Sequence, residues 1–231
     1  MKNTLILIIS FMVLAASSSA QKSEPITVKA GTRVQDYFPL QERYRYPGFI
    51  DGTVVFKNGA TTDAKLNYNL LSGEMEYIHS RDTLAISNPI DINYIALQEE
   101  DTFFYNRKSY LELIFSDKIK VALKQNITLK QVLKHDSYGV SGSGSATESI
   151  NSLQTTGNSY KLIVNQDRVF QKISEFFLTT SSGEFVPFTK KKILQLFPQK
   201  KEAIHEYLKS NKVDFESKND LVRLVGFLQN L

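Results

Sequence analysis

The sequence contains no cysteine and no tryptophan among its 231 residues. Without cysteine, the chain has no disulfide, no thiolate metal ligand, no thiol nucleophile and no attachment point for the lipid of a bacterial lipoprotein. The formal charge of +4 is too small to indicate a nucleic-acid partner. Hydrophobic residues make up 42% and charged residues 23%, which is typical of a globular chain and not of a disordered one.

One strongly apolar run is present, and it lies at the N-terminus. Lys2 precedes an apolar stretch over Leu5–Ala16, and Ser17–Ala20 are small. This order matches the charged start, apolar core and small-residue end of a secretory signal. The apolar core falls short of the roughly 20 residues of a membrane-spanning helix. We therefore expect cleavage between Ala20 and Gln21 and an exported protein, in the periplasm or outside the cell, without a transmembrane anchor after signal removal.

Alternating apolar and polar residues dominate the segment from Thr53 to Lys124. The alternation is complete in Ala64–Asn69, where it places Ala64, Leu66 and Tyr68 on one face of a strand. Asn58-Gly59 and Ser72-Gly73 are turn sequences of hairpins. The β-rich runs cover residues 53–57, 64–69, 74–77, 84–86, 90–97, 102–105, 110–115 and 118–124. Because their connections are too short for crossover helices, we expect an antiparallel sheet.

The remaining chain has a polar connector and a helical end. Phe176–Thr180 and Glu184–Phe188 flank a Ser-Ser-Gly turn and indicate a hairpin, although the pattern leaves residues 169–177 open to strand or helix. Thr189 and Ser217 are suited to cap helices. Spaced apolar residues then predict amphipathic helices, with apolar faces formed by Ile204, Tyr207, Leu208, Leu221, Leu224, Val225 and Leu228.

These patterns together predict an α+β fold. We expect a curved antiparallel β-meander, with a half-barrel as one form of it, and a small C-terminal helical segment. The predicted divisions are a signal peptide (1–20), a β-rich region (21–136), a Ser/Gly-rich loop or linker (137–159), and a short hairpin followed by two or three helices (160–231).

The sequence offers no motif for catalysis, a cofactor or a metal ion. Glu74 and Glu76 share one strand face, and His79 lies close to Asp82. A hydrolase could use such carboxylates or His79, but their spacing alone does not establish the geometry that hydrolysis requires. We therefore favour a non-enzymatic protein.

Aromatic and arginine residues cluster before the first long strand. Tyr37, Arg43, Tyr44, Arg45 and Tyr46 have the composition of a recognition surface. The favoured alternative is a segment that wraps over the core, because large aromatic side chains contribute most to burial.

Several segments resemble a group of exported Bacteroidota proteins of unknown function. The resemblance is carried by Gly52–Gly59, Ala64–Asn69, Gly73–Tyr77, Asp82–Ala85 and Leu196-Phe197-Pro198. It implies a cell-envelope setting and no particular activity.

Asp82-Thr83-Leu84 also resembles a three-residue O-glycosylation pattern of exported Bacteroidota proteins, which makes Thr83 a candidate acceptor. For function, the sequence predicts an envelope protein that binds an unidentified envelope partner or a small ligand. The alternatives are a carrier of an apolar ligand on a curved sheet, and the hydrolase described above.

Overall fold

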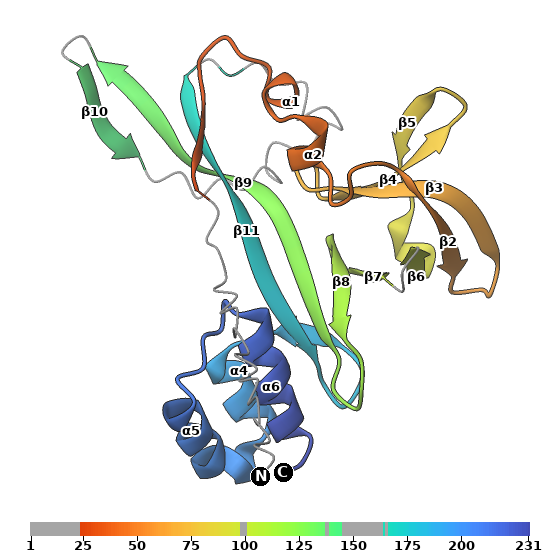
Figure 1. Cartoon of the computed structure of the whole chain (residues 1–231), viewed down its shortest axis with the longest axis vertical. Coiled ribbons are helices and arrows are strands. Elements are labelled where there is room, and N and C mark those ends of the chain that lie inside the picture. The colour runs from red at the N-terminus through yellow and green to blue at the C-terminus, as the bar shows by residue number, and fades with distance from the viewer. Residues whose placement is uncertain (1–23, 98–100, 137–138, 145–163, 165) are drawn as a thin grey trace, which may run out of the picture.

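The computed structural model describes residues 24–97, 101–136, 139–144, 164 and 166–231. The strands in these ranges form one antiparallel sheet (Figure 1). They are β1 (Ile26–Val28), β2 (Ile50–Phe56), β3 (Thr61–Asn69), β4 (Glu74–His79), β5 (Asp82–Ala85), β6 (Ile92–Leu97), β7 (Thr102–Asn106), β8 (Ser109–Phe115), β9 (Val121–Asp136), β10 (Gly139–Gly144), β11 (Asp167–Thr179) and β12 (Phe185–Pro187). The helices are α1 (Val34–Tyr37), α2 (Leu40–Arg43), α4 (Lys190–Leu196), α5 (Lys201–Ser210) and α6 (Lys218–Leu228), with 3-10 turns η1 (Pro89–Asp91) and η5 (Pro198–Lys200).

The predicted antiparallel sheet and C-terminal helices are confirmed. The eight β-rich runs correspond to β2 through β9, and the strand order is β1-β11-β9-β8-β7-β6-β2-β3-β4-β5. β10 pairs with β9 and β12 pairs with β11 outside this path. The order does not return to its start, so the sheet is open. Gly59 and Gly73 adopt positive φ angles of 85° and 73°, as the predicted hairpin turns require.

One region that the sequence left open is now assigned, and another differs from its prediction. Residues 169–177, which the pattern left open, are strand and belong to β11. Gly139–Gly144 was predicted as part of the loop but forms β10, because the long strand β9 offers it backbone hydrogen-bond partners. The remainder of that predicted loop, at 137–138 and 145–159, lies outside the described residues, as do the predicted signal peptide and its cleavage site.

The N-terminal elements were not predicted. β1 has three residues, and α1 and α2 have four residues each, so none has a periodic pattern long enough to recognise. β1 adds to the edge of β11 through the pair Ile26 and Phe170. This addition brings the start of the described chain beside its C-terminal half.

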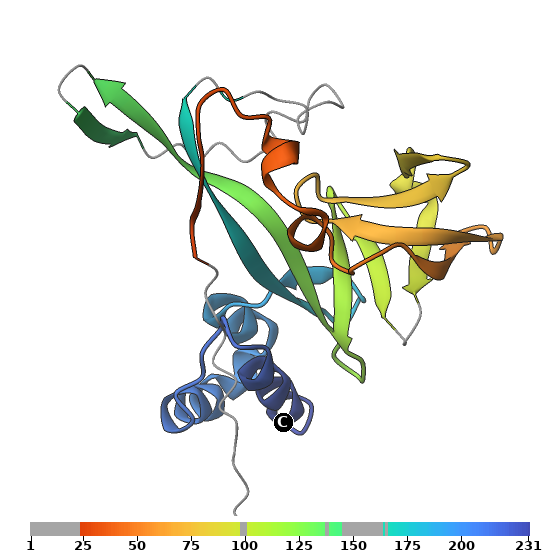
Figure 2. The same ribbon diagram turned by 45° about the horizontal axis from the view of Figure 1, so that its top comes forward.

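Two apolar clusters form the core. The first, the sheet core, joins buried residues of β1 to β4, β6 to β9 and β11, including Leu66, Tyr68 and Ile95. The second, the helix core, packs α4, α5 and α6 against one end of the long β9 and β11 strands, as Figures 1 and 2 show. All the apolar residues predicted for the α5 and α6 faces are buried or packed in it.

Both predicted helix caps are present. The Thr189 hydroxyl accepts a hydrogen bond from Lys192 N at 3.2 Å, and the Ser217 hydroxyl accepts one from Asp220 N at 3.4 Å. Each cap satisfies a backbone N–H that has no partner within the helix.

Gly52 in β2 allows close approach of β6, so a larger residue at this position is expected to destabilise the fold. A Cβ at Gly52 would lie 2.5 Å from Leu97 Cδ2 and 2.9 Å from the Ala96 carbonyl oxygen. Gly52→Ala is therefore expected to lower the free energy of unfolding by about 1–3 kcal/mol in urea titration. Gly48→Ala is the matched control, because a Cβ there meets nothing within 4 Å. An equal effect at both positions would contradict the close packing.

Candidate ligand-binding pocket

The predicted cluster of aromatic and arginine residues lies in α1, α2 and the short segment that follows them. Residues 44–46, which we call the connector, follow α2 in the chain and lead toward β2. They run antiparallel to β3, with Tyr44 paired to Asn69. Arg45 N donates to the Tyr68 carbonyl oxygen at 2.9 Å, and Leu70 N donates to the Arg43 carbonyl oxygen at 2.8 Å. This extended pairing directs Tyr44 and Arg45 to opposite sides.

All three connector side chains donate hydrogen bonds to carboxylates of the sheet region. The bonds are Tyr44 to Glu76 at 2.5 Å, Arg45 to Glu112 through two bonds of 2.8 Å, and Tyr46 to Asp101 at 2.6 Å. The carboxylates come from β4, from β8 and from the residue preceding β7. The connector therefore ties together parts of the sheet that are distant in sequence.

The five predicted surface residues have different environments. Tyr44 is buried, and Arg43, Arg45 and Tyr46 are half-buried. The favoured alternative, a segment that wraps over the core, describes the connector well. Tyr37 is 43% exposed, so a contact with a partner at this position stays a prediction.

The environment of the connector changes the pKa values of nearby groups. Burial raises the pKa of the Tyr44 and Tyr46 phenols, and the carboxylates that accept their hydrogen bonds raise them further. Burial also raises the pKa of Tyr68 on β3 and of Tyr110 on β8. Burial is the largest cause of all four shifts, because it disfavours the charged phenolate.

Two charged groups close to this region are also shifted. Partial burial lowers the pKa of Lys172 in β11, and the nearby Arg45 guanidinium adds to the effect while Glu112 opposes it. Partial burial and the Glu76 carboxylate raise the pKa of Glu74. Each shift favours the neutral form of the group.

An apolar pocket is formed by residues of β2, β3 and β4 together with the β2–β3 turn and the segment between β5 and β6. Its volume is about 640 Å³. The apolar wall is formed by Val54, Phe56, Ala64, Leu66, Tyr77 and Ile86. The polar lining residues are Lys57, Asn58, Thr62, Ser87, Asn88 and Asp91. The pocket thus combines an apolar wall with polar and charged groups, as small-molecule sites do.

Strand register and two turns position this pocket. Leu66 is directly opposite Tyr77 in the β3–β4 pair, so both side chains point to the same face. Lys57 N donates to the Asp91 carbonyl oxygen at 2.9 Å, which fixes the β2–β3 turn against η1. Ile86 N donates to the Met75 carbonyl oxygen at 3.0 Å and holds the segment after β5 beside β4.

Exposed apolar side chains lie close to the lining residues of the pocket. Leu84, opposite Tyr77 in the β4–β5 pair, is 42% exposed. Ile90, in the same 3-10 turn as Asp91, is 68% exposed. Apolar surface left in water next to an apolar cavity is typical of a binding site.

The residues considered for hydrolysis lie in different environments. Glu76 accepts hydrogen bonds from Tyr44 and, at 2.8 Å, from Asn69 Nδ2, so its carboxylate is engaged within the fold. His79 is exposed and lies opposite Asp82 in the β4–β5 pair. Across the described ranges, no group of three or more His, Asp or Glu side chains is arranged to hold a metal ion.

Thr83, the candidate glycosylation site, lies on β5 and is exposed. Its modification stays a prediction. In the part of the chain that the structure describes, no helix has both the length and the apolar character needed to cross a bilayer.

The sequence did not predict this pocket, although it predicted one strand face that contributes to it. The alternation in β3 placed Ala64 and Leu66 on a common apolar face, and both line the pocket. The contributions of Phe56, Ile86 and the turn at 87–91 depend on how distant segments pack, for which the sequence carries no local signal. The same is true of Glu112, which is 67 residues away from its partner Arg45.

Comparison with known proteins gives no match to a family model, to a curated protein or to a solved structure. The functional argument therefore rests on the geometry described above.

Proposed function

We propose that this protein is a non-catalytic binding module of the cell envelope whose ligand is a small apolar molecule. The observation that carries the proposal is the pocket of about 640 Å³ with its wall of six apolar side chains. This volume falls within the range of about 300–1,000 Å³ of ordinary ligand sites.

The lining indicates how such a ligand would be held. Burial of an apolar chain against Leu66 and Phe56 contributes about 0.8 kcal/mol for each methylene removed from water. Polar groups of Asn58, Asn88 and Asp91 among the lining residues can orient a hydroxyl or amide at one end of the ligand. A molecule with one acyl chain and a small uncharged polar end fits this arrangement.

We also propose that the sheet is bent in the manner of a half-barrel. The Tyr68 ring on β3 lies 5.7 Å from the Phe103 ring on β7 and 6.2 Å from the Tyr110 ring on β8. Ile127 N on β9 donates to the Leu70 carbonyl oxygen at 2.7 Å. Contacts between strands so far apart in the sheet order support a bend that gives the pocket its concave wall.

The setting of the protein is part of the proposal. The charged, apolar and small-residue order of the first 20 residues and the resemblance to exported Bacteroidota proteins support export to the envelope. Electrophoresis and intact-mass measurement of the protein from cell fractions test this directly. A product that retains residues 1–20 in the cytoplasm would refute it.

Binding of a neutral apolar probe tests the pocket. N-phenyl-1-naphthylamine is expected to bind the purified, delipidated protein saturably with a rise in fluorescence. Ala64→Phe is expected to weaken this binding by about tenfold or more, because the added ring occupies the cavity. Ala85→Phe is the matched control, since Ala85 lies on exposed β5 and does not line the pocket.

Near-UV circular dichroism of both variants establishes that they are folded. Absence of saturable binding by the unmodified protein would refute the proposed function. An equal loss in Ala64→Phe and Ala85→Phe would show that the probe does not occupy this pocket.

A further inference from the structure

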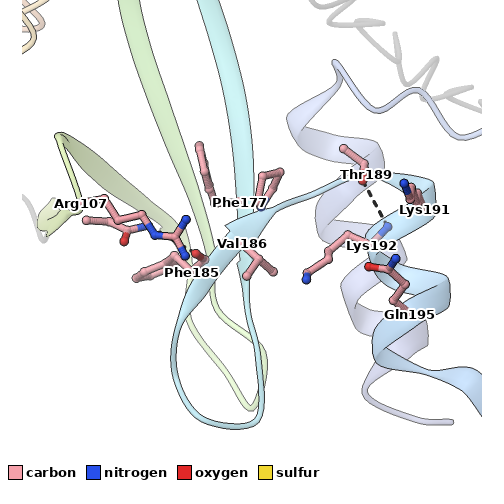
Figure 3. A pocket seen from close by; sticks show the side chains of 10 residues that line it. Arg107, Phe177, Phe185, Val186, Thr189, Lys191, Lys192 and Gln195 are labelled. Atoms are coloured by element: carbon pink, nitrogen blue, oxygen red, sulfur yellow. Dashed lines mark hydrogen bonds between the residues drawn. The ribbon is translucent and has the colours of Figure 1, made fainter.

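A second pocket lies where the sheet meets the helical segment (Figure 3). Its volume is about 320 Å³. The β7–β8 turn contributes Arg107, β11 contributes Phe177, β12 contributes Phe185, and α4 contributes Lys192 and Gln195. The pocket thus draws on four separate parts of the chain and is distinct from the apolar pocket of β2–β4.

The charged lining of this second pocket has one sign. Arg107, Lys191 and Lys192 line it, and no acidic side chain of the described residues does. Glu184, which is not a lining residue, accepts a hydrogen bond from Arg107 Nη2 at 2.6 Å. Because both partners of this pair are more than half exposed, water screens it strongly, and an anion in the pocket can compete for the guanidinium.

The floor of the pocket is apolar. Phe177, Phe185 and Pro187 share one face of the β11–β12 hairpin. Asn106 Nδ2 donates to the Phe185 carbonyl oxygen at 3.3 Å, which holds the β7–β8 turn beside this hairpin. In Figure 3 the Lys192 side chain extends from α4 toward the hairpin. Lys192 therefore lines the same pocket as these apolar side chains.

The β7–β8 turn fixes the backbone at Arg107. Its φ angle is +60°, a left-handed conformation that glycine or asparagine adopts more easily than arginine does. A two-residue hairpin turn requires a positive φ angle, and Ser80 in the two-residue β4–β5 turn adopts one of +58° as well. The turn thus holds a guanidinium over the pocket at a position where a small residue would be the ordinary choice.

We propose that this pocket binds a small organic anion with an apolar body, such as an aryl or alkyl carboxylate. The apolar floor favours the body of such a molecule, and the cations favour its charged end. An inorganic anion would leave the aromatic floor unused, and a neutral apolar molecule would leave the cations without a counter-charge. The site goes beyond the proposed apolar-ligand function and does not depend on it.

Paired probes of equal shape test this site. Isothermal titration calorimetry is expected to show binding of 4-phenylbutyrate, and binding of 4-phenyl-1-butanol that is weaker by about tenfold because the alcohol lacks the charge. Lys192→Gln is expected to reduce the affinity for the carboxylate by about tenfold and to leave that for the alcohol unchanged. Lys209→Gln, the same charge change on an exposed residue of α5, is the control and is expected to have no effect.

Three results would overturn the proposal. They are no saturable binding of 4-phenylbutyrate, an equal loss of affinity in Lys192→Gln and Lys209→Gln, and a loss of carboxylate binding in Ala64→Phe. The last would place the ligand in the apolar pocket instead. Because the apolar pocket is tested with a neutral probe, failure of one proposal is distinguishable from failure of the other.

Discussion

Replacement of Arg45 by methionine is expected to lower the free energy of unfolding by about 3–5 kcal/mol. The Glu112 side chain is only 8% exposed and accepts two parallel hydrogen bonds from the Arg45 guanidinium. Without the arginine, the buried carboxylate would lose both hydrogen bonds and its paired charge, and the partly buried Lys172 would be the cation left to compensate its lost hydration. Urea unfolding followed by far-UV circular dichroism measures the change. An unchanged dependence of the unfolding free energy on urea concentration shows that only stability has altered.

Two further variants make this measurement specific. Lys65→Met breaks the Lys65–Asp51 pair, in which both side chains are more than half exposed, and is expected to cost about 0–1 kcal/mol. The double variant Arg45→Met/Glu112→Leu removes both buried charges and is expected to recover most of the loss, because no unpaired charge remains. If Arg45→Met cost no more than Lys65→Met, Glu112 would have to be hydrated in the folded protein.

Above pH 10 the folded protein is expected to lose stability steeply, by about 5 kcal/mol per pH unit. Tyr44, Tyr46, Tyr68 and Tyr110 all lie at least partly buried, and burial raises the pKa of each phenol above its value of 10 in the unfolded chain. The folded state then holds protons that the unfolded state releases, so stability present below pH 10 is lost as the pH rises.

The shift of Lys172 has the opposite sign. Its pKa is lowered in the folded state, so its contribution rises with pH but is complete near pH 10.5, the ordinary value for lysine. With a total stability of about 5–15 kcal/mol, the tyrosines are sufficient to unfold the protein within a few pH units above 10. Circular dichroism and absorbance at 295 nm, recorded together, follow unfolding and phenolate formation.

Two phenylalanine variants separate titration from hydrogen bonding. The Tyr110 hydroxyl has no hydrogen-bond partner among the described residues, so Tyr110→Phe is expected to preserve stability at pH 7 and to reduce the alkaline slope by about a quarter. Tyr68→Phe removes the bond that the Tyr68 hydroxyl donates to Asn126 at 2.7 Å and is expected to cost about 1 kcal/mol at pH 7. Complete phenolate formation before any loss of circular dichroism would show that these phenols are accessible to solvent.

The sequence predicts those parts of the fold that depend on local pattern. Alternation in residues 64–69 specified β3 and its apolar face, and the glycines at 59 and 73 specified two turns. The spacing of Leu221, Leu224 and Leu228 specified the buried face of α6. In each case the information lies within one turn, one strand or one helix.

The rest of the fold depends on partners that are far apart in the chain. Gly139–Gly144 has the composition of a linker, yet β9 supplies the backbone partners that make it a strand. The connector has the composition of a recognition surface, yet carboxylates on three other segments engage its side chains. Neither outcome follows from composition, because each depends on strand register set elsewhere in the fold.

The long ladder of backbone pairs between β9 and β11 has a consequence for how the protein unfolds. Ile127, Leu129 and Phe170 of these strands belong to the sheet core, whereas Val121, Phe176 and Leu178 of the same strands belong to the helix core. The hydrogen-bonded pairs run through both regions, from Asp167 opposite Leu133 to Leu178 opposite Val121. Neither core can separate from these strands without disturbing the scaffold of the other, which couples them into a single cooperative unit.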